Sequence, residues 1–395
     1  MFIGVLPART RRVEREHRLK VLHVYRTYFP DPPGGLQEAV RQIALATGRE
    51  GVESRIFTLS PRPDPDVIER PEGRVVRCRS WAAPASCDLG GPAAFRRFAE
   101  LARWADVIHY QFPWPFADLL HLAVRPAAPA VLTYQSDIVR QRWLGRVYTP
   151  LMQRTLNAMA AVVATSPAYA RTSPVLAALA DPKRLRMIPN GIDEASCTAP
   201  LAEARDIDVS QRYGLEAGRY FLFVGVFRYY KGLHSLMAAA RQAGVTIVLA
   251  GEGPERAALE SMAAGLPSGR VRFLGQVTEA EKFALIRDCR ALVLPSHLRS
   301  EAFGMVLVEA AMLGRPMISC EIGTGTSFVN AHDETGLVVP PEAPVELAAA
   351  MSCLAADDAL VRRYGEAARA RYERLFSGAV LGRAYADAYR GVLNA

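Results

Sequence analysis

The chain has 395 residues, of which 50% are hydrophobic and 22% are charged, and its formal net charge is +8. This composition is typical of a globular protein of two domains, and no apolar run approaches the roughly 18–20 residues that a membrane span needs. The six cysteines form no C-x-x-C pair, which argues against a metal or disulfide framework and favours a reducing compartment.

The first 18 residues are expected to form a flexible basic arm. Residues 1–20 carry six basic and two acidic groups and show neither apolar periodicity nor the features of a signal peptide. Basic residues without interleaved aromatic ones argue against a nucleic-acid partner, and they fit contact with an anionic membrane surface at least as well. We therefore expect a cytoplasmic protein, either free or peripheral on the cytoplasmic face of the inner membrane.

Short apolar segments then alternate with helical patterns. The strands predicted in the first half cover residues 20–25, 55–59, 74–77, 106–109, 130–134 and 161–164, with a strand and turn at 186–193. The first strand leads into Gly34 and Gly35, which would let the backbone approach a ligand closely, and a tight turn is the alternative. The strand at 130–134 ends in Gln135, and Asp137 follows as a ligand-facing group or as a helix cap.

An amphipathic helix is predicted over residues 138–160. Trp143 and Tyr148 share its apolar face, and Arg142 and Arg146 point away. The pattern fits a core helix with a solvated back, or a basic surface anchored by tryptophan that lies on lipid headgroups.

Residues 195–215 are polar and mixed, and we interpret them as a hinge. A second series of strands is predicted at 220–225, 246–251, 271–275, 291–294, 316–320 and 336–339, before helices over 344–395. Alternating strands and helices predict an α/β fold with two doubly wound parallel-sheet domains that face each other across a cleft. The expected domains are 19–200 and 201–375, and a last helix at 376–395 is expected to cross back to the first domain.

Residues 295–314 carry the strongest local signal. A buried strand leads into a loop with Glu301, and a helix begins at Gly304 and contains Glu309. The first amides of a helix attract anions, whereas carboxylates accept hydrogen bonds from hydroxyl groups and repel phosphate. This spacing fits a nucleoside diphosphate sugar, and an ordinary strand-loop-helix with two surface glutamates is the alternative.

The residues with metal-binding chemistry are dispersed. The pairs Asp64/Asp66 and Asp206/Asp208 lie in a proline-rich loop and in the hinge, so we expect solvated carboxylates, no metal ligands and no metal requirement. His109, His297 and His332 lie near strand ends, but a lone histidine is more often structural.

Four motifs together resemble the second domain of the family 4 retaining glycosyltransferases, which have the GT-B fold. They are the segments 224–232, 251–254, 273–277 and 295–309, in the order and spacing of that family. Segments 228–233 and 318–326 further resemble the branch that builds mannan-type or D-rhamnan-type O-antigen chains from GDP-linked sugars.

The resemblance implies a role for most of the candidate residues. Glu309 would hold the ribose diol, and Glu301 would hold a hydroxyl group of the donor sugar. Lys231 and a nearby arginine would neutralise the diphosphate. The amides of Gly304, Met305 and Val306 would add hydrogen-bond donors, and the base would lie near Gln276 and Val277.

Two positions depart from the pattern of the family. Val226 stands where an arginine is usual, so the candidate arginine is Arg228. Gln135 stands where a histidine often contacts the donor sugar, and glutamine can orient a sugar but cannot carry a proton. Asp137 is then the nearest ionisable group on that loop.

We predict a glycosyltransferase that moves a mannose or D-rhamnose type hexose, with retention, from a nucleotide-sugar donor to a growing glycan or a polyprenyl-linked acceptor. The leaving phosphate would take the acceptor's proton, so no cofactor is expected and the donor is a substrate. A UDP-linked donor, an epimerase or phosphorylase on a similar frame, and a non-catalytic sugar-binding protein are the alternatives. Loops 31–37, 111–116 and 135–143 are expected to set the sugar and the acceptor.

Overall fold

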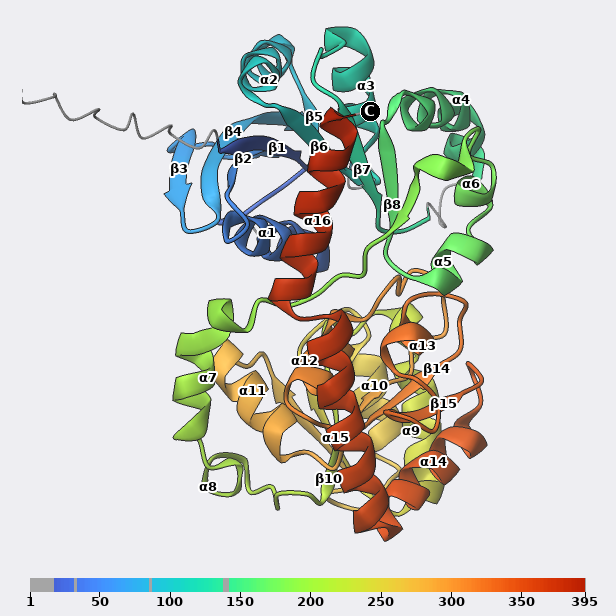
Figure 1. Cartoon of the computed structure of the whole chain (residues 1–395). Helices are drawn as coiled ribbons and strands as arrows, with labels where there is room; N and C mark the ends of the chain where they lie inside the picture. The colour runs from blue at the N-terminus through green and yellow to red at the C-terminus, as the bar shows by residue number, and fades with distance from the viewer. Residues whose placement is uncertain (1–17, 32–33, 85–86, 138–141, 395) are drawn as a thin grey trace, which may run out of the picture.

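The computed structural model describes residues 18–31, 34–84, 87–137 and 142–394, and the side chains of 142–147 are not described (Figure 1). Two sheets with helices on both faces form an upper and a lower half (Figure 1). The predicted arm lies outside the described residues except for Arg18. Most of the lipid-facing surface predicted for 138–160 also lies outside the described side chains.

The first sheet has the order β3-β4-β2-β1-β6-β7-β8-β9, and β5 pairs with β4. All pairs are parallel except those of β4 with β3 and β5. The strands are β1 (Leu19–Val24), β2 (Val52–Ser60), β3 (Val67–Arg70), β4 (Gly73–Ala82), β5 (Leu89–Gly90), β6 (Val107–Phe112), β7 (Ala130–Tyr134), β8 (Ala161–Ala164) and β9 (Leu185–Met187).

The second sheet is parallel throughout, with the order β12-β11-β10-β13-β14-β15. Its strands are β10 (Tyr220–Val224), β11 (Thr246–Ala250), β12 (Val271–Gly275), β13 (Ala291–Leu294), β14 (Met317–Cys320) and β15 (Gly336–Val339). Each predicted strand overlaps an observed one. The short antiparallel strands β3 and β5 were not predicted, because neither is a distinct apolar run.

Helices cover both sheets (Figure 1). Those of the first half are α1 (Gly35–Gly48), α2 (Pro92–Trp104), α3 (Pro115–Val124), α4 (Arg142–Ala158), α5 (Pro167–Thr172) and α6 (Pro174–Ala177). The later ones are α7 (Thr198–Arg205), α8 (Val209–Tyr213), α9 (Leu233–Ala243), α10 (Arg256–Ala263), α11 (Glu279–Asp288), α12 (Met305–Met312), α13 (Thr326–Val329), α14 (Pro344–Ala356), α15 (Asp358–Leu375) and α16 (Gly378–Leu393).

Local sequence explains where several helices begin. Proline occupies the first turn of α2, α3 and α14, where its missing N–H is not needed. Helix α11 begins with a capping box in which Thr278 and Glu281 satisfy each other's backbone N–H groups.

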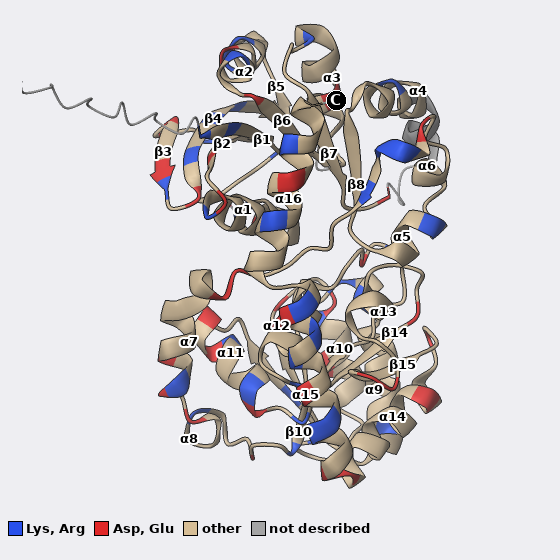
Figure 2. Ribbon diagram, viewed as in Figure 1, with Lys and Arg blue, Asp and Glu red and all other residues tan. Residues whose placement is uncertain are grey.

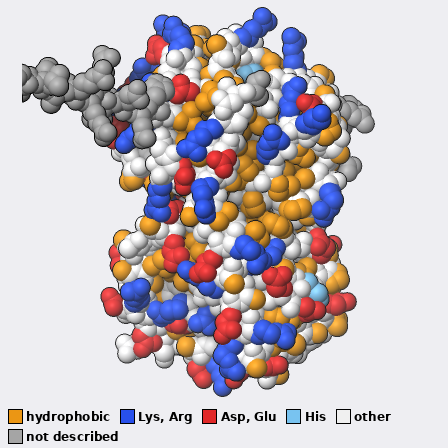
Figure 3. Space-filling model, viewed as in Figure 1, with side chains coloured by type: hydrophobic (Ala, Val, Ile, Leu, Met, Phe, Trp, Pro, Cys, Tyr) orange, Lys and Arg blue, Asp and Glu red, His pale blue; other side chains and the backbone are white. Residues whose placement is uncertain are grey.

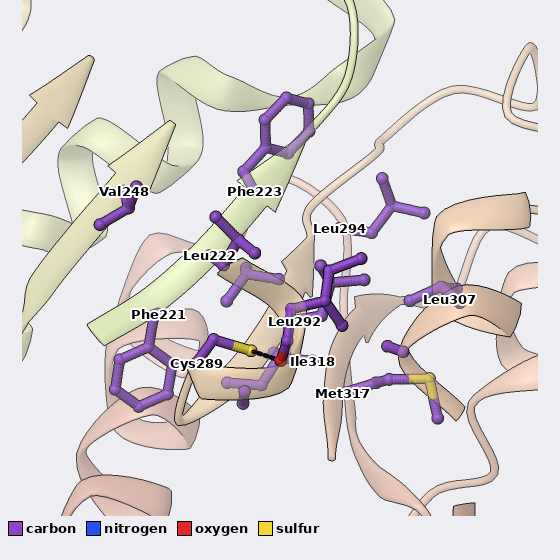
Figure 4. Close-up of a cluster of buried hydrophobic side chains, with 14 of the residues drawn as sticks. Phe221, Leu222, Phe223, Val248, Cys289, Leu292, Leu294, Leu307, Met317 and Ile318 are labelled. Carbon is purple, nitrogen blue, oxygen red and sulfur yellow. Dashed lines mark hydrogen bonds between the residues drawn. The ribbon is translucent and has the colours of Figure 1, made fainter. Parts of the chain in front are cut away.

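A buried apolar cluster between sheet and helices holds the second half together. Figure 4 shows part of this cluster, in which side chains of β10, β13 and β14 pack with Leu307 of α12. The same cluster includes Ala204, Val209 and Leu215, and Arg287 of α11 donates to the carbonyls of Ala204 and Ile207 at 2.6 and 2.9 Å. The predicted hinge at 195–215 therefore contains two helices that pack against the second half, which its polar composition concealed.

Helix α16 returns to the first half and lies beside α1 (Figure 1). Its Tyr389 bonds to the buried His109 at 2.8 Å, and its Tyr385 bonds to Thr133 at 2.9 Å. Backbone and side-chain bonds between Ile192 and the end of α15 join the two places where the chain crosses between the halves.

Positive and negative side chains are distributed over both halves. Figure 2 shows Lys, Arg, Asp and Glu on helices of both sheets, and Figure 3 shows the two signs interspersed over the lower half of this face. In the part of the chain that the structure describes, no helix is both long and apolar enough to span a bilayer.

Candidate active site

A cavity of about 430 Å³ lies between the two halves. The first half contributes the start of α1, the end of β7 and Asn190. The second half contributes the loops after β10 and β13 together with residues of α11 and α12. The lining residues are Gly35, Leu36, Gln135, Ser136, Asn190, Val224, Gly225, Tyr230, Lys231, Lys282, Ser300, Glu301, Ala302, Phe303, Gly304, Met305, Val306 and Glu309.

The topology of the second sheet explains why two of these loops meet. Strand order reverses between β10 and β13, so their loops leave the sheet in opposite directions and open a crevice. A backbone bond of 3.0 Å from His297 N–H to the Tyr230 carbonyl joins the loops. Lys231 and Glu301, 70 residues apart in sequence, are thereby brought together.

Lys231 and Glu301 form an ion pair in the cavity wall. Ser296 donates a second hydrogen bond to the Glu301 carboxylate at 3.1 Å, and Thr324 bonds to its carbonyl at 2.8 Å. Burial opposes the charge of Lys231, but Glu301 and Tyr230 outweigh this effect and raise the pKa of the ammonium. A charged lysine and an oriented carboxylate therefore stand side by side.

A second pair, Lys282 and Glu309, lines the same cavity at a distance of 2.7 Å. Burial raises the pKa of Glu309, and Lys282 offsets this effect only in part. Lys282 also contacts Glu279 at 2.8 Å, and the two carboxylates raise the pKa of the lysine despite its burial. Sequence reasoning missed Lys282, because next to Glu279 it has the spacing of an ordinary exposed i,i+3 pair.

Helix α12 begins in the cavity wall. Gly304 precedes it with φ +81°, and a Cβ there would come within 2.9 Å of Leu294 and 3.0 Å of Leu307. Glycine avoids both the strain and the clash. Met305 and Val306, the first helical residues, line the cavity, and the first amides of a helix have no partner within it.

The first half forms the opposite wall. Asn190, which was not predicted, donates to Gln135 at 2.9 Å, and Gln135 donates to Gln111 at 3.1 Å. Gln111 in turn bonds to the buried His109 at 3.2 Å. This buried network fixes the side chain of Gln135 in the cavity wall and connects it to α16.

Not all predicted residues line this cavity. Arg228 is exposed, and Gln276 and Val277 lie just before α11. Gly34 lines an adjoining cavity of about 680 Å³ that shares Gly35, Lys282, Met305 and Glu309. Its φ of −156° is extended, so no left-handed backbone requires glycine there.

Asp137 takes part in an ion pair between the two halves. Its carboxylate accepts from Arg299 of the β13–α12 loop at 3.0 Å, from Ser173 at 2.7 Å and from Tyr134 at 3.0 Å. Arg299 also donates to Thr172 at 2.9 Å. Asp137 thus contacts the loop that carries Glu301 without lining the cavity.

Among the loops expected to set specificity, 111–116 is buried. Phe112 belongs to β6, Trp114 and Phe116 pack in the core, and Trp114 donates to the Asp88 carbonyl at 2.8 Å. Its aromatic side chains serve packing, whereas Leu36 and Ser136 of the other two loops do line the cavity. Residues 138–141 lie outside the described residues.

The cavity wall combines groups that attract anions with carboxylates that accept hydrogen bonds. Lysine and free helix amides bind an anion such as diphosphate, and two carboxylates accept hydrogen bonds from hydroxyl groups. This combination fits a ligand that contains both phosphates and a polyol.

Two protein families match most of the chain. Residues 208–371 match the family described as "Glycosyl transferases group 1", and residues 34–191 match the "Glycosyl transferase 4-like domain".

Two curated proteins are similar over nearly their whole length. The "D-rhamnosyltransferase WbpZ" of Pseudomonas aeruginosa is 43% identical over 359 residues, which cover 91% of this chain and 92% of that protein. The "O-antigen chain mannosyltransferase C" of Escherichia coli is 38% identical over 376 residues, which cover 95% and 99%.

Solved structures share the fold. Sucrose-phosphate synthase from Thermosynechococcus elongatus superimposes with a TM-score of 0.76 at 24% identity, covering 95% of this chain and 100% of that one. Anabaena Alr3699/HepE in complex with UDP has a TM-score of 0.76 at 18% identity, covering 94% and 100%. The GT-B fold expected from the sequence is thereby confirmed.

Proposed function

This chain belongs to the family 4 (group 1) glycosyltransferases, and on that basis we propose that it transfers mannose or D-rhamnose from a GDP-linked donor to a growing O-antigen-type glycan. The observation that carries the proposed chemistry is the placement of two lysine–glutamate pairs around the start of α12 in one cavity. The names of the two full-length relatives support the choice of sugar and acceptor.

The diphosphate of the donor binds beside Lys231 and the first amides of α12. The side chain of Lys231 is charged and only 13% exposed, so its attraction to phosphate is screened less than it would be in water. Arg228, exposed three residues earlier, contributes positive charge to the same loop. Glu301, oriented by Ser296, accepts a hydrogen bond from a hydroxyl group of the donor sugar.

The nucleoside lies at the other end of α12. Glu309 accepts hydrogen bonds from the ribose diol, and Lys282, 2.7 Å away, favours the charged form of this carboxylate. The base lies near Gln276 and Val277, which directly precede α11 and its residue Lys282.

The reaction retains the configuration of the anomeric carbon. The bond between that carbon and the diphosphate oxygen breaks, and the acceptor oxygen forms its bond on the same face while its proton passes to the leaving phosphate. Lys231 and the helix amides stabilise the charge that develops on the diphosphate. Gln135 orients the sugar from the first half, and Asp137 acts indirectly by holding Arg299.

The acceptor is a glycan chain or a polyprenyl-linked precursor. An enzyme acting on a lipid-linked acceptor would work in peripheral contact with an anionic membrane, to which the net positive charge of the chain is suited.

Radiolabelled transfer assays test the proposal. GDP-mannose, GDP-D-rhamnose and several UDP-sugars are each incubated with the protein and a polyprenyl-linked O-antigen primer, and nucleotide binding is measured by thermal shift. We expect an acceptor-linked product from a GDP-sugar, and Tm raised by GDP because a ligand that binds the folded state stabilises it.

Each alternative outcome overturns a different part of the proposal. Product from a UDP-sugar alone overturns the donor assignment, and nucleotide binding without transfer identifies a sugar-binding protein. Absence of any nucleotide binding overturns the whole proposal. Glu301→Gln is expected to lower kcat by about 10²-fold or more, whereas Glu216→Gln, a change at an exposed residue, is expected to leave transfer unchanged.

A further inference from the structure

Three potential metal ligands lie close together outside the donor cavity. Within the described ranges, His234, His297 and Glu342 form a group whose ligand atoms all lie within 4.8 Å of one another. His234 is the second residue of α9, His297 lies in the loop after β13, and Glu342 lies in the loop after β15. None of the three lines the donor cavity.

His297 is distinguished by the missing hydrogen bonds of its buried ring. Its side chain is buried, at 8% exposure, yet neither Nδ1 nor Nε2 has a hydrogen-bond partner. An imidazole always carries at least one nitrogen that needs a partner, and burial without one is costly. An ion held at the ring would remove this cost.

The neighbouring side chains are arranged around that ring. The rings of His234 and His297 have centroids 5.0 Å apart and meet at 85°. Nε2 of His234 lies 3.9 Å from the Glu342 carboxylate, and Tyr229 stacks on His234 with an interplanar angle of 12°.

The ligand types identify the class of ion. Two imidazoles with one carboxylate suit Zn²⁺ and related transition metals, whereas Mg²⁺ and Ca²⁺ prefer sites made of oxygen. Ligand atoms around a tetrahedral Zn²⁺ are about 3.4 Å apart, given bonds of about 2.0–2.1 Å. Glu342 is exposed, at 61% side-chain exposure, and His234 is half-buried, so inward rotation of these two side chains would bring the three ligand atoms to that spacing.

We propose that His234, His297 and Glu342 form a Zn²⁺-type site that ties together the start of α9 and the loops after β13 and β15. His234 lies three residues after Lys231, and His297 lies four residues before Glu301. An ion at this site therefore steadies the two loops that hold the Lys231–Glu301 pair. Three protein ligands leave a fourth position for water, and because the site lies outside the donor cavity the ion takes no part in sugar transfer.

Metal titration tests the site without reference to catalysis. Protein dialysed against a chelator is titrated with zinc sulfate by calorimetry, and with Co²⁺ while visible absorption is recorded. We expect about one equivalent of Zn²⁺ to bind, Co²⁺ to give a tetrahedral spectrum, and Zn²⁺ to raise Tm. His297→Ala and Glu342→Gln are each expected to weaken binding by about tenfold or more.

Matched controls separate this site from adventitious binding. His332→Ala and Glu346→Gln change exposed residues outside the cluster and are expected to bind Zn²⁺ as the unmodified protein does. The proposal is overturned if the unmodified protein binds no Zn²⁺, or if both ligand variants keep its affinity. Glu342 is exposed, so Glu342→Gln keeps the test decisive even where His297→Ala fails to fold. Binding without any transferase activity would leave this site standing and count only against the proposed function.

Discussion

Lys282 is the residue whose role depends most on its surroundings. Its ammonium lies between Glu309, whose side chain is only 17% exposed, and the exposed Glu279, so it offsets part of the cost that burial imposes on the charged form of Glu309. Removing one partner of a buried pair leaves an uncompensated charge, which costs far more than losing an exposed pair.

Lys282→Met is therefore expected to lower the free energy of unfolding by on the order of 3 kcal/mol and to weaken nucleotide binding. Glu279→Gln removes only the partner at 67% side-chain exposure and is expected to cost less than about 1 kcal/mol. Urea unfolding of both variants checks this difference. Equal losses would show that the contact with Glu309 is not the stabilising one.

Asp118 is a buried acid whose titration should affect stability. Burial raises its pKa to about 7, and hydrogen bonds from Tyr148 and Thr155 offset this effect only in part. The folded state thus holds a proton that the unfolded state releases near pH 4. Asp118 is therefore expected to reduce stability progressively as pH rises from about 4 to about 7, with the full loss present above that range.

Asp118→Asn removes this titration. Relative to the unmodified protein, the variant is expected to become more stable by on the order of 2 kcal/mol when pH is raised from 5 to 8. Parallel denaturation curves at the two pH values provide the measurement. A difference between the two proteins that does not change with pH would contradict the assignment.

At the scale of elements, the start of α12 and the start of α1 face the same cavity but differ in backbone. Gly304 is left-handed and its Cβ would meet two leucines, whereas a Cβ on Gly35 meets nothing within 4 Å. The backbone and the packing at Gly304 require glycine, whereas the space around Gly35 would admit a side chain.

Gly304→Ala is expected to cost about 1–2 kcal/mol of stability and to weaken GDP binding, because it moves the amides of α12. Gly35→Ala serves as the control and is expected to leave stability unchanged within about 0.5 kcal/mol. Thermal unfolding and calorimetric titration with GDP measure both effects. Full GDP affinity in Gly304→Ala would argue against a role for the helix amides.

At the scale of the whole molecule, the two halves are connected by two chain crossings and by side-chain contacts that include the Arg299–Asp137 ion pair. The pair is partly exposed, with side-chain exposures of 29% and 14%, and neither residue lines the cavity. An exposed pair adds little stability but can set the balance between open and closed arrangements.

Arg299→Ala is expected to change the free energy of unfolding by less than about 1 kcal/mol, yet to increase the radius of gyration measured by small-angle X-ray scattering. Arg362→Ala, a change at an exposed arginine of α15, provides the control. Identical scattering from Arg299→Ala and the unmodified protein would show that the ion pair does not hold the halves together.

The fold was largely predictable because its signals are local. Runs of four or five buried, mostly apolar residues, each with a glycine or proline directly at one end, mark β7, β10 and β13, and their alternation with helices indicates parallel sheets. The elements that were misjudged lack such a run. Helices α7 and α8 are only eight and five residues long, and this segment folds against α11 through contacts with a residue about 80 positions away.

The candidate site also contains residues that the sequence singled out and partners that only the tertiary structure revealed. Glu301, Gly304 and Glu309 lie in one contiguous segment and Lys231 lies in a second motif, so the sequence by itself singled out these four residues, which line one cavity beside α12. The tertiary structure alone decided the partners: Lys282 for Glu309, Asn190 for Gln135 and Arg299 for Asp137, which are 27, 55 and 162 residues apart. An ion pair or hydrogen bond depends on distance in space, and no periodicity in the chain encodes a contact between segments that meet only after both sheets have formed.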